Sequence, residues 1–458
     1  MARYALIGKT LAHSQSQALH RLIGNTEYDM LEIPDESGLQ QTLDDTAYDG
    51  FNVTIPYKEA VIKYLDEISE RARAANAVNV IKRTEDGRLI GYNTDIGGFM
   101  HMVGNRANGR KCLVLGTGGA ARGVAVGLEL LGAKSVILVS RNPEQAATKL
   151  GKEFRIIGYD KLENYYDSQV VVNATPVGTI PHNEQSPIKL AGHSMTIFDR
   201  LELAVDLIYN PYRTKFLQDA RRLTGCKTMS GLEMLIYQAI EARNIWNGRK
   251  SSVLSDKLNE GIIKKEILKN QLNIVAVGMP GSGKTTIFRK YANEMGKPFI
   301  DIDKRTEELM GETIEEVLAP GGKGEEYFRE KECEAIQEAS GHTGTVIATG
   351  GGSVLNPINR DLLRSNGLVV YIKRPTGDLS IKGRPISQKI GVTELFNSRS
   401  RIYRKMADIT IQNTKTFGGR KASTGEGDSY FYEMKKFVYA MSRKIERYIG
   451  EISRNKWT

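Results

Sequence analysis

The chain has 458 residues, of which 40% are apolar and 26% charged, and its formal net charge is +10. These values are ordinary for a globular protein with room for several domains, and no apolar run reaches the about 20 residues that a membrane span needs. Three cysteines without metal-ligand spacing exclude a disulfide framework, so we expect a cytoplasmic enzyme with no membrane partner.

Short strand patterns alternate with helical stretches over the first hundred residues. The strand patterns are Tyr4–Gly8, Gly50–Ile55 and Val78–Ile81, and the longest helical stretch is Tyr57–Ala75. Strands separated by helices predict parallel sheets throughout the chain. The expected fold class is therefore α/β.

A glycine-rich loop follows the strand pattern Cys112–Leu115 and opens a helix-compatible run over Ala121–Leu131. The free N–H groups of a helix N-terminus attract phosphate, so this order of elements predicts a dinucleotide-binding lobe. The next strand pattern ends in Ser140-Arg141, where an NAD site usually carries an acid. Arginine suits a 2′-phosphate instead, and we predict NADP(H). The residues expected to bind it are Gly116, Gly118, Gly119, Ala120, Ser140 and Arg141.

Two more strand patterns, Val170–Asn173 and Leu203–Asp206, and a helix over about 230–247 complete the first half. The stretch after this helix is rich in Lys, Ser and Asn and has no long apolar period, so we interpret 248–270 as a flexible linker. Such a linker brings two domains together without building a tunnel. We therefore expect no direct channel for an intermediate.

A second glycine loop, Gly278–Thr285, follows the strand pattern Ile274–Val277 and fits the P-loop motif G-x-x-x-x-G-K-T. Its backbone cradles phosphates, its lysine reaches the β- and γ-phosphates, and its threonine binds Mg²⁺. The loop predicts ATP, Mg²⁺ and phosphoryl transfer without indicating the acceptor. The residues expected to bind ATP are Gly278, Gly281, Gly283, Lys284, Thr285 and Thr286.

Two carboxylates stand at the end of the next strand pattern, Phe299–Ile302. Alternate residues of a strand share a face, so Asp301 and Asp303 are expected to approach one cluster of Mg²⁺, phosphate and acceptor. We predict Asp301 and Thr285 as metal ligands. Helix capping by Asp303 is the alternative interpretation.

The second half continues with strand patterns at Thr345–Ala348 and Val369–Ile372 and ends in an amphipathic helix. Much of the net positive charge lies beyond residue 400, where Arg443, Lys444 and Arg447 fall at helical spacing. We interpret these side chains as a solvated helix face and expect no nucleic-acid partner.

Two segments of the first half, Asn52–Lys58 and Gly91–Asp95, have the sequence and the spacing of one enzyme family. With the glycine loop, they make the first 250 residues resemble shikimate dehydrogenase, which reduces 3-dehydroshikimate to shikimate with NADPH. The resemblance implies that Lys58 and Asp95 are catalytic. It also implies that the substrate is bound by Ser14, Ser16, Thr54, Asn79, Tyr209 and Gln238.

The residue types suit this reaction. Reduction of a ketone builds negative charge on oxygen, which Lys58 can stabilise or protonate. Asp95 can pair with Lys58 and accept hydrogen bonds from ring hydroxyls. Departures from the family on the substrate side, at Thr10, Gln17 and Asn76, leave open a preference for quinate.

Motifs of the second half follow the order of another family: Asp301-x-Asp303, Glu326–Arg329, Gly350–Gly352, Arg384–Ile386 and Arg399-x-x-x-Tyr403. They make residues 272–410 resemble shikimate kinase, a P-loop enzyme with α/β/α layers. The resemblance implies that Asp303, Lys284 and Arg384 are catalytic, with Arg384 on a mobile lid. It also implies that shikimate is bound by Asp303, Arg329, Gly351 and Arg399, the arginines taking its carboxylate.

The two resemblances name consecutive reactions, and we predict a bifunctional shikimate-pathway enzyme. Its expected parts are a substrate-binding catalytic lobe (1–105, completed by helix 230–247), a Rossmann NADP lobe (106–229), a linker (248–270) and a kinase-like P-loop domain (271–458). We expect 3-dehydroshikimate and shikimate as its partners, in a monomer or a homodimer. Two alternatives stay open: a quinate dehydrogenase fused to a related small-molecule kinase, and a half that only senses ligands.

Overall fold

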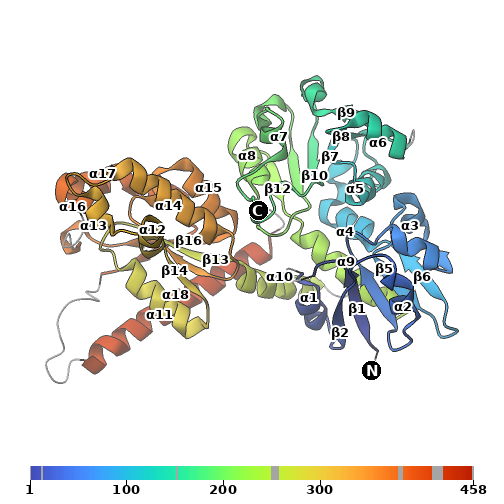
Figure 1. Ribbon diagram of the computed structural model, residues 1–458, viewed down its shortest axis with the longest axis horizontal. Helices are drawn as coiled ribbons and strands as arrows, with labels where there is room; N and C mark the ends of the chain where they lie inside the picture. Colours follow the sequence, from blue (N-terminus) through green and yellow to red (C-terminus); the bar gives the residue numbers. More distant parts are fainter. Residues whose placement is uncertain are drawn as a thin grey trace.

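The computed structural model of the protein describes residues 2–11, 14–150, 153–248, 257–379, 385–414 and 427–455. Three sheets form two bodies, which helix α10 (Lys257–Gln271) connects (Figure 1). The body on the right of Figure 1 holds the two sheets that precede α10, and the body on the left holds the third sheet. The predicted α/β class is confirmed. None of the described helices is long and apolar enough to cross a membrane.

The first sheet has the strand order β2-β1-β3-β5-β6-β4. Strand β5 runs antiparallel to β3 and β6, so the expectation of parallel sheets throughout is wrong here. A tight turn with Gly87 at φ +85° joins β5 to β6, and it leaves no room for a crossover helix. The elements are β1 (Tyr4–Gly8), α1 (Ser16–Leu22), β2 (Tyr28–Glu32), α2 (Gly38–Asp44), β3 (Gly50–Val53), η1 (Ala60–Tyr64), β4 (Glu67–Ile68), α3 (Glu70–Ala75), β5 (Val80–Arg83), β6 (Leu89–Tyr92) and α4 (Thr94–Val103).

The helix expected over Tyr57–Ala75 is divided into η1, β4 and α3. Ser69 has an extended backbone and caps α3, because its side chain accepts a hydrogen bond from the Ala72 N–H (3.3 Å). The start of α3 therefore lies inside a stretch whose pattern had predicted one continuous helix.

The second sheet is parallel and has the order β12-β11-β10-β7-β8-β9. This is the doubly wound order of a dinucleotide-binding domain, with its switch point beside β7. Its elements are η2 (Gly104–Ala107), β7 (Lys111–Leu115), α5 (Gly119–Leu130), β8 (Ser135–Ser140), α6 (Pro143–Leu150), β9 (Arg155–Gly158), η3 (Tyr159–Tyr165), β10 (Val170–Asn173), α7 (Pro187–Leu190), η4 (Met195–Ile197), β11 (Leu203–Asp206), α8 (Lys215–Thr224), β12 (Lys227–Met229) and α9 (Leu232–Trp246).

The third sheet is also parallel, with the order β14-β15-β13-β16-β17. Helices cover both of its faces (Figure 1). Ile274 and Ala276 of β13 face one core, while Val275 and Val277 face the other. The elements are β13 (Asn273–Val277), α11 (Lys284–Met295), β14 (Phe299–Asp301), α12 (Ile302–Met310), α13 (Ile314–Leu318), α14 (Gly324–Ser340), β15 (Val346–Ala348), η6 (Ser353–Leu355), α15 (Pro357–Ser365), β16 (Gly367–Lys373), η7 (Thr376–Asp378), α16 (Pro385–Ile390), α17 (Val392–Met406), β17 (Ile409–Gln412) and α18 (Gly427–Ser453).

Helix α10 occupies most of the segment that we expected to be a flexible linker, and for 257–270 that expectation is wrong. Its residues Ile263, Ile267 and Leu268 are buried in one continuous core. The same core contains Ile236 from α9 of the first half and Ile274 from β13 of the second. Burial against both halves therefore stabilises this helix, although the weak apolar period of its sequence did not predict a helix.

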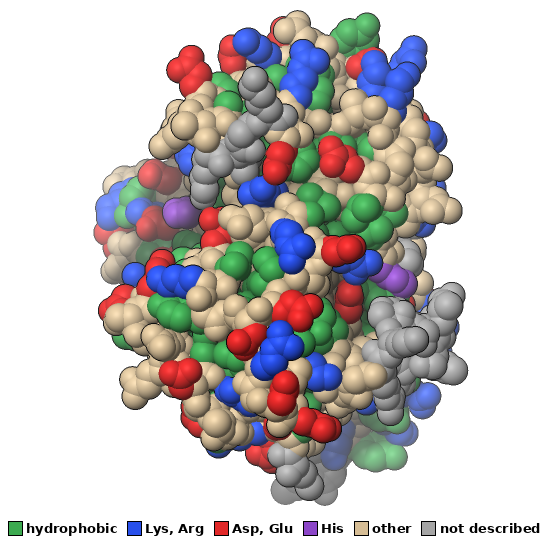
Figure 2. All heavy atoms as spheres, turned by 90° about the vertical axis from the view of Figure 1, so that its right-hand side faces the viewer, with side chains coloured by type: hydrophobic (Ala, Val, Ile, Leu, Met, Phe, Trp, Pro, Cys, Tyr) green, Lys and Arg blue, Asp and Glu red, His purple; other side chains and the backbone are tan. Residues whose placement is uncertain are grey.

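The charged side chains are well mixed on the face of the first half that Figure 2 shows. Acidic and basic groups lie interspersed among polar and apolar ones, and no single sign dominates the described residues on this face. The net charge of the chain is therefore not gathered here into one patch.

Candidate active sites

Lys58 and Asp95 meet between the two sheets of the first half. Lys58 Nζ lies 2.6 Å from Asp95 Oδ2, and both side chains are partly buried. Asp95 stands in the first turn of α4, whose N-cap is Asn93, so the Asp95 carboxylate is left for the lysine. The residues predicted to be catalytic are thus brought together as an ion pair.

A small cavity places this pair opposite the first glycine loop. It is lined by Lys58 and Asp95 on one side and by Gly119 and Ala120 at the start of α5 on the other. Val124 of α5 and Met234 of α9 complete part of its wall. A molecule bound along the α5 N-terminus would therefore reach the lysine directly.

The residues predicted to bind the substrate form two groups around this cavity. Asn79 is buried and bonds to the residue before Asp95, since its Oδ1 accepts from the Thr94 N–H (2.8 Å). Ser14 Oγ donates to Ser16 Oγ (3.0 Å), and the backbone of Gln15, between these serines, lies beside the Tyr209 hydroxyl. Tyr209 therefore lies beside the serine pair, although it comes from the end of a distant strand.

Two other residues predicted to bind the substrate, Thr54 and Gln238, donate hydrogen bonds to backbone carbonyl groups. Thr54 follows β3 and donates its backbone N–H to Ile7 O (2.9 Å). Gln238 on α9 turns its amide to Leu235 O (3.0 Å) in its own helix. Their roles in substrate binding stay predictions.

The dinucleotide loop has the shape that a phosphate requires. Gly116 has φ +114°, and a Cβ there would lie 3.3 Å from Ala174 O, so glycine is favoured. Gly118 is the N-cap of α5 and faces open space. Ser140 ends the neighbouring strand β8, and the next side chain, Arg141, is exposed. The loop and the arginine therefore lie at one edge of the sheet, where a dinucleotide would bind.

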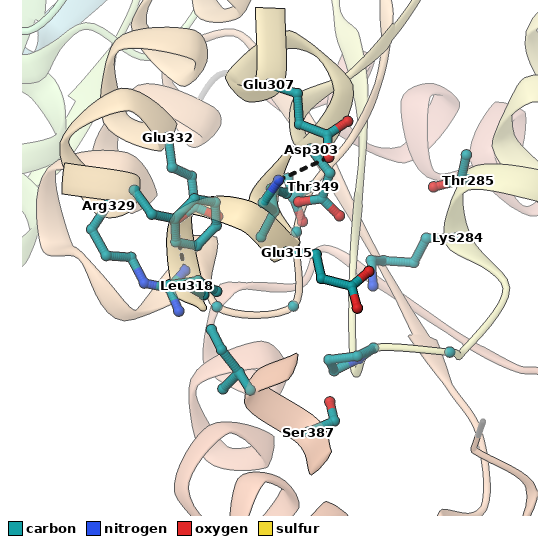
Figure 3. A pocket seen from close by; sticks show the side chains of 18 of the residues that line it. Lys284, Thr285, Asp303, Glu307, Glu315, Leu318, Arg329, Glu332, Thr349 and Ser387 are labelled. Atoms are coloured by element: carbon teal, nitrogen blue, oxygen red, sulfur yellow. Dashed lines mark hydrogen bonds and ion pairs between the residues drawn. The ribbon is translucent and has the colours of Figure 1, made fainter. Parts of the chain in front are cut away.

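The second half contains a cavity of about 500 Å³ (Figure 3). Lys284 points into it from the P-loop, Arg329 lies on the opposite side on α14, and Asp303 lies between them. The cavity therefore joins the P-loop to the predicted shikimate-binding residues. The predicted residues that line it are Gly281, Gly283, Lys284, Thr285, Thr286, Asp303, Arg329, Gly351 and Arg399.

The P-loop backbone surrounds its lysine. Gly281 and Gly283 have φ +78° and +93°, a conformation that turns successive N–H groups toward one point. Lys284 is buried and donates to Gly278 O (2.9 Å) and Met279 O (3.0 Å). This arrangement fits the phosphates of a nucleoside triphosphate, which need N–H donors and a cation at the same place.

The carboxylates after β14 are placed differently from the prediction. Asp303 lies in the first turn of α12 and not on the strand, because β14 ends at Asp301. The strand-face argument for the two carboxylates is therefore wrong. Asp303 reaches the cavity from the helix, whereas Asp301 is the N-cap of α12, and its carboxylate lies 3.9 Å from Arg289. The role of Asp301 as a metal ligand stays a prediction.

The environment of Asp303 changes its acidity. Burial raises the pKa of Asp303 to about 6; the nearby Lys284 ammonium opposes this rise, and the acids Asp301, Glu332 and Glu307 add to it. The carboxyl group therefore titrates close to neutral pH, which suits a group that accepts a proton from an acceptor hydroxyl.

A tripeptide of glycines separates Asp303 from Arg329. A Cβ on Gly350 would lie 2.4 Å from Asp303 Oδ1, and one on Gly352 would lie 2.5 Å from Arg329 Nη1. Arg399 is buried beside the hydroxyl of Tyr403, which donates to Gly351 O (2.5 Å). Gly350 and Gly352 therefore allow Asp303 and Arg329 to pack closely against this tripeptide.

Our sequence reasoning assigned no role to several residues around the cavity. Glu332 is 2% exposed, and its Oε2 accepts from Arg329 Nη1 (2.8 Å), while its Oε1 accepts from Ser353 Oγ (2.6 Å). An acid three residues after Arg329, on the buried side of an amphipathic helix, was a signal that could have been found. Other polar residues that line the cavity are Glu307, Thr313, Glu315, Thr349 and Ser387. The predicted catalytic Arg384 lies outside the described residues.

Comparison with known proteins identifies both halves. Residues 6–81 match the family model for the shikimate dehydrogenase substrate binding domain. A shikimate dehydrogenase (NADP(+)) from Clostridium perfringens is 39% identical over 280 residues, which cover 58% of this chain and 98% of the relative. The chain belongs to the shikimate dehydrogenase family. Residues 280–421 match the family model for shikimate kinase, so the predicted fusion of the two enzymes is confirmed.

Solved structures agree with this identification of the dehydrogenase half. A chorismate mutase/shikimate 5-dehydrogenase fusion protein from Clostridium acetobutylicum is 38% identical, with a TM-score of 0.52, and covers 58% of this chain and 98% of that chain. Shikimate dehydrogenase 1 from Peptoclostridium difficile is 32% identical, with a TM-score of 0.51, and covers 57% of this chain and 98% of that chain. The kinase half is the remainder that these structures do not cover.

Proposed function

We propose that the chain reduces 3-dehydroshikimate to shikimate with NADPH and then phosphorylates shikimate on its 3-hydroxyl with ATP. The observation that carries the first reaction is the Lys58–Asp95 pair, which faces the N-terminus of α5 across a small cavity. The second reaction is supported by the cavity that joins Lys284 to Asp303, Arg329 and Arg399.

In the dehydrogenase half, the residues arrange the ketone and supply a proton. When bound, the reduced nicotinamide supplies the hydride that reduces the carbonyl carbon. Lys58 stabilises the negative charge that builds on the carbonyl oxygen and gives it a proton. Asp95 holds the lysine in place and accepts hydrogen bonds from the ring hydroxyls. Ser14 and Ser16 donate to the substrate carboxylate, with Tyr209 beside them.

In the kinase half, most of the work is positioning and charge stabilisation. When bound, ATP with Mg²⁺ supplies the phosphoryl group. Arg329 and Arg399 hold the shikimate carboxylate, and Asp303 orients the 3-hydroxyl and takes its proton. Lys284 stabilises the charge on the transferring phosphoryl group.

Thr285 and Asp301 are proposed to hold the magnesium ion together with the nucleotide. Mg²⁺ usually keeps several waters and binds through phosphates and one or two protein oxygens. Among the described residues, no group of three or more His, Cys, Asp or Glu side chains forms a cage for a metal. The site therefore fits an ion that arrives with ATP.

Arg141 is proposed to select NADPH by pairing with the 2′-phosphate, since it is exposed directly after Ser140 at the end of β8.

We also propose that the enzyme works in the cytoplasm. The absence of disulfides supports this proposal, since Cys112, Cys226 and Cys333 are all free, as is usual in a reducing compartment.

The two activities can be separated by substitution in one chain. We would follow NADPH loss with 3-dehydroshikimate and ADP release with added shikimate, in wild type, Lys58→Ala and Lys284→Ala. Lys58→Ala should stop reduction and keep phosphorylation, and Lys284→Ala should do the reverse. The exposed lysines Lys63 and Lys304 provide matched controls, Lys63→Ala and Lys304→Ala, which should keep both activities. If one substitution abolished both activities, or neither, the assignment of the two sites would be wrong.

A further inference from the structure

The loop that carries Tyr209 lies at the junction between the dehydrogenase and kinase halves. It follows β11 and runs to Arg213, just before α8. Tyr212 in this loop is 1% exposed and belongs to the core that α10, α9 and the kinase sheet share. The loop is therefore packed against the kinase half and not against solvent.

Backbone groups of this loop are held by side chains and carbonyls from beyond residue 270. Gln271 Nε2 donates to Tyr209 O (2.6 Å), and the Tyr212 N–H donates to Asn366 Oδ1 (3.3 Å). The Arg213 N–H donates to Ser365 O (2.7 Å). Gln271 ends α10, and the other two residues stand just before β16. The kinase half thus provides hydrogen-bond partners for three polar backbone groups of the loop.

The guanidinium of Arg213 extends the same contact. Its Nη1 donates to Gly367 O (3.0 Å), and its Nη2 lies 3.6 Å from Asp408 Oδ1. Asp408 in turn accepts from the Tyr448 hydroxyl (2.9 Å) and from the Val369 N–H (2.8 Å). Because these partners belong to strands and helices of the kinase half, the far end of the loop is attached to a rigid support.

The near end of the loop reaches the substrate side of the dehydrogenase. The Tyr209 hydroxyl lies beside the backbone of Gln15, which stands between Ser14 and Ser16. One tyrosine therefore has its carbonyl held by Gln271 and its hydroxyl placed beside the serine pair. A shift of the carbonyl would move the hydroxyl, since both belong to one residue in a short loop.

We propose that Gln271 is a positioning residue for the dehydrogenase, through which the kinase half holds Tyr209 in place to bind 3-dehydroshikimate. The inference rests on the proposed role of Tyr209 in substrate binding. Its consequence is that the dehydrogenase site of this chain is completed by the fused kinase. Loss of the Gln271 side-chain amide weakens binding of 3-dehydroshikimate and spares the binding of NADPH and the kinase reaction.

The test is steady-state kinetics of the full chain with Gln271→Met, which keeps the size of the side chain and removes its donor. The KM for 3-dehydroshikimate should rise by about threefold to tenfold, the effect of one hydrogen bond, with kcat and the KM for NADPH little changed. Gln271→Ala should act in the same direction. Asn183→Ala is the control, because the Asn183 amide also crosses between the halves, to Ser340 Oγ (3.2 Å) and to the side chain of Ser365 (3.1 Å), yet is hydrogen-bonded to neither Tyr209 nor Gln271.

Tyr209→Phe, measured in parallel, separates the two ways in which the inference can fail. If Tyr209→Phe raises the KM for 3-dehydroshikimate and both Gln271 variants do not, Tyr209 binds the substrate without help from Gln271, and the inference is overturned. If Tyr209→Phe has no effect, the proposed role of Tyr209 is wrong and the inference falls with it. An equal loss of both activities in Gln271→Met, matched by Asn183→Ala, would show general loosening of the interface and would also overturn it.

Discussion

The ion pair between Glu233 and Lys264 allows a quantitative test of how tightly the two halves are joined. Glu233 lies in the first turn of α9 and Lys264 on α10; their side chains are 1% and 2% exposed, with 2.5 Å between Oε1 and Nζ. Lys264 Nζ also donates to Asn455 O (2.7 Å), after α18. Lys264→Met removes both contacts and leaves a buried carboxylate without its cation. Breaking such a pair costs about 3–5 kcal/mol of the free energy of unfolding.

The loss in Lys264→Met should depend on pH. Burial raises the pKa of Glu233 above its ordinary value, and in wild type the Lys264 ammonium opposes this rise. Without the lysine, the folded-state pKa of Glu233 rises further above its unfolded value. A group of this kind favours folding at pH below its unfolded pKa, and that contribution is lost as pH rises through the folded pKa. The deficit of the variant should therefore be largest at alkaline pH and smaller in acid.

Urea unfolding followed by circular dichroism at several pH values measures this deficit. Lys265→Met is the matched control, since Lys265 is the next residue of α10 and is exposed. The double variant Glu233→Gln/Lys264→Met should recover much of the loss, because no buried charge is left. A loss in Lys264→Met below about 1 kcal/mol, as expected of an exposed pair, would show that the buried Glu233–Lys264 ion pair does not hold the two halves together.

Further predictions concern each site and the passage of shikimate. Burial raises the pKa of Asp303 to about 6, so kcat/KM for shikimate should fall as pH drops through this value. Asp303→Asn should lower kcat about 10²–10⁴-fold. A pH profile that stays flat would contradict the role of Asp303 as the proton acceptor. Gly352→Ala places a Cβ 2.5 Å from Arg329 Nη1, so the KM for shikimate should rise about 10–100-fold with dehydrogenase kinetics unchanged. Arg141→Asp should reduce the preference for NADPH over NADH by about 10–100-fold, measured as the ratio of kcat/KM values. Added unlabelled shikimate should dilute label that passes from 3-dehydroshikimate to the phosphorylated product; retention of the label would show a channel.

The prediction that added shikimate dilutes the label rests on the separation of the two sites in the structure. The kinase sheet contacts the dehydrogenase through the residues just before β13 and β16, at the amino ends of its strands. The P-loop follows Val277, at the carboxyl end of β13. A strand of this length spans about 17 Å, so the kinase cavity opens at the sheet edge away from the dehydrogenase. Separation of the sites, and not a flexible linker, is the reason to expect exchange with solvent.

The parts of the sites that could be predicted from sequence are those that short motifs encode. Gly116–Ala120 and Gly278–Thr285 need only a strand before them and a helix after them, and the structure has both. The pairing of Lys58 with Asp95 followed from the family resemblance, and the ion pair confirms that they meet. Such predictions succeed because the chemistry limits which residues can stand at each position.

The parts that could not be predicted depend on contacts between distant residues. Lys264 and Gln271 have the composition of a polar surface helix, yet both are buried, because Glu233, Tyr209 and Asn455 supply their partners. The apolar residues of α10 face two bodies at once, which removes the simple amphipathic period that a helix on one core would show. No local pattern carries this information.

The most direct test of the bifunctional assignment is the product formed by the wild-type chain from 3-dehydroshikimate, NADPH, ATP and Mg²⁺, followed by mass spectrometry with parallel measurement of NADPH and ADP. We predict that shikimate appears first and is converted to shikimate 3-phosphate, with ADP formed in step with the phosphorylated product. Without NADPH, no ADP should form until shikimate is added. Reduction without phosphorylation, or phosphorylation of 3-dehydroshikimate itself, would contradict the account.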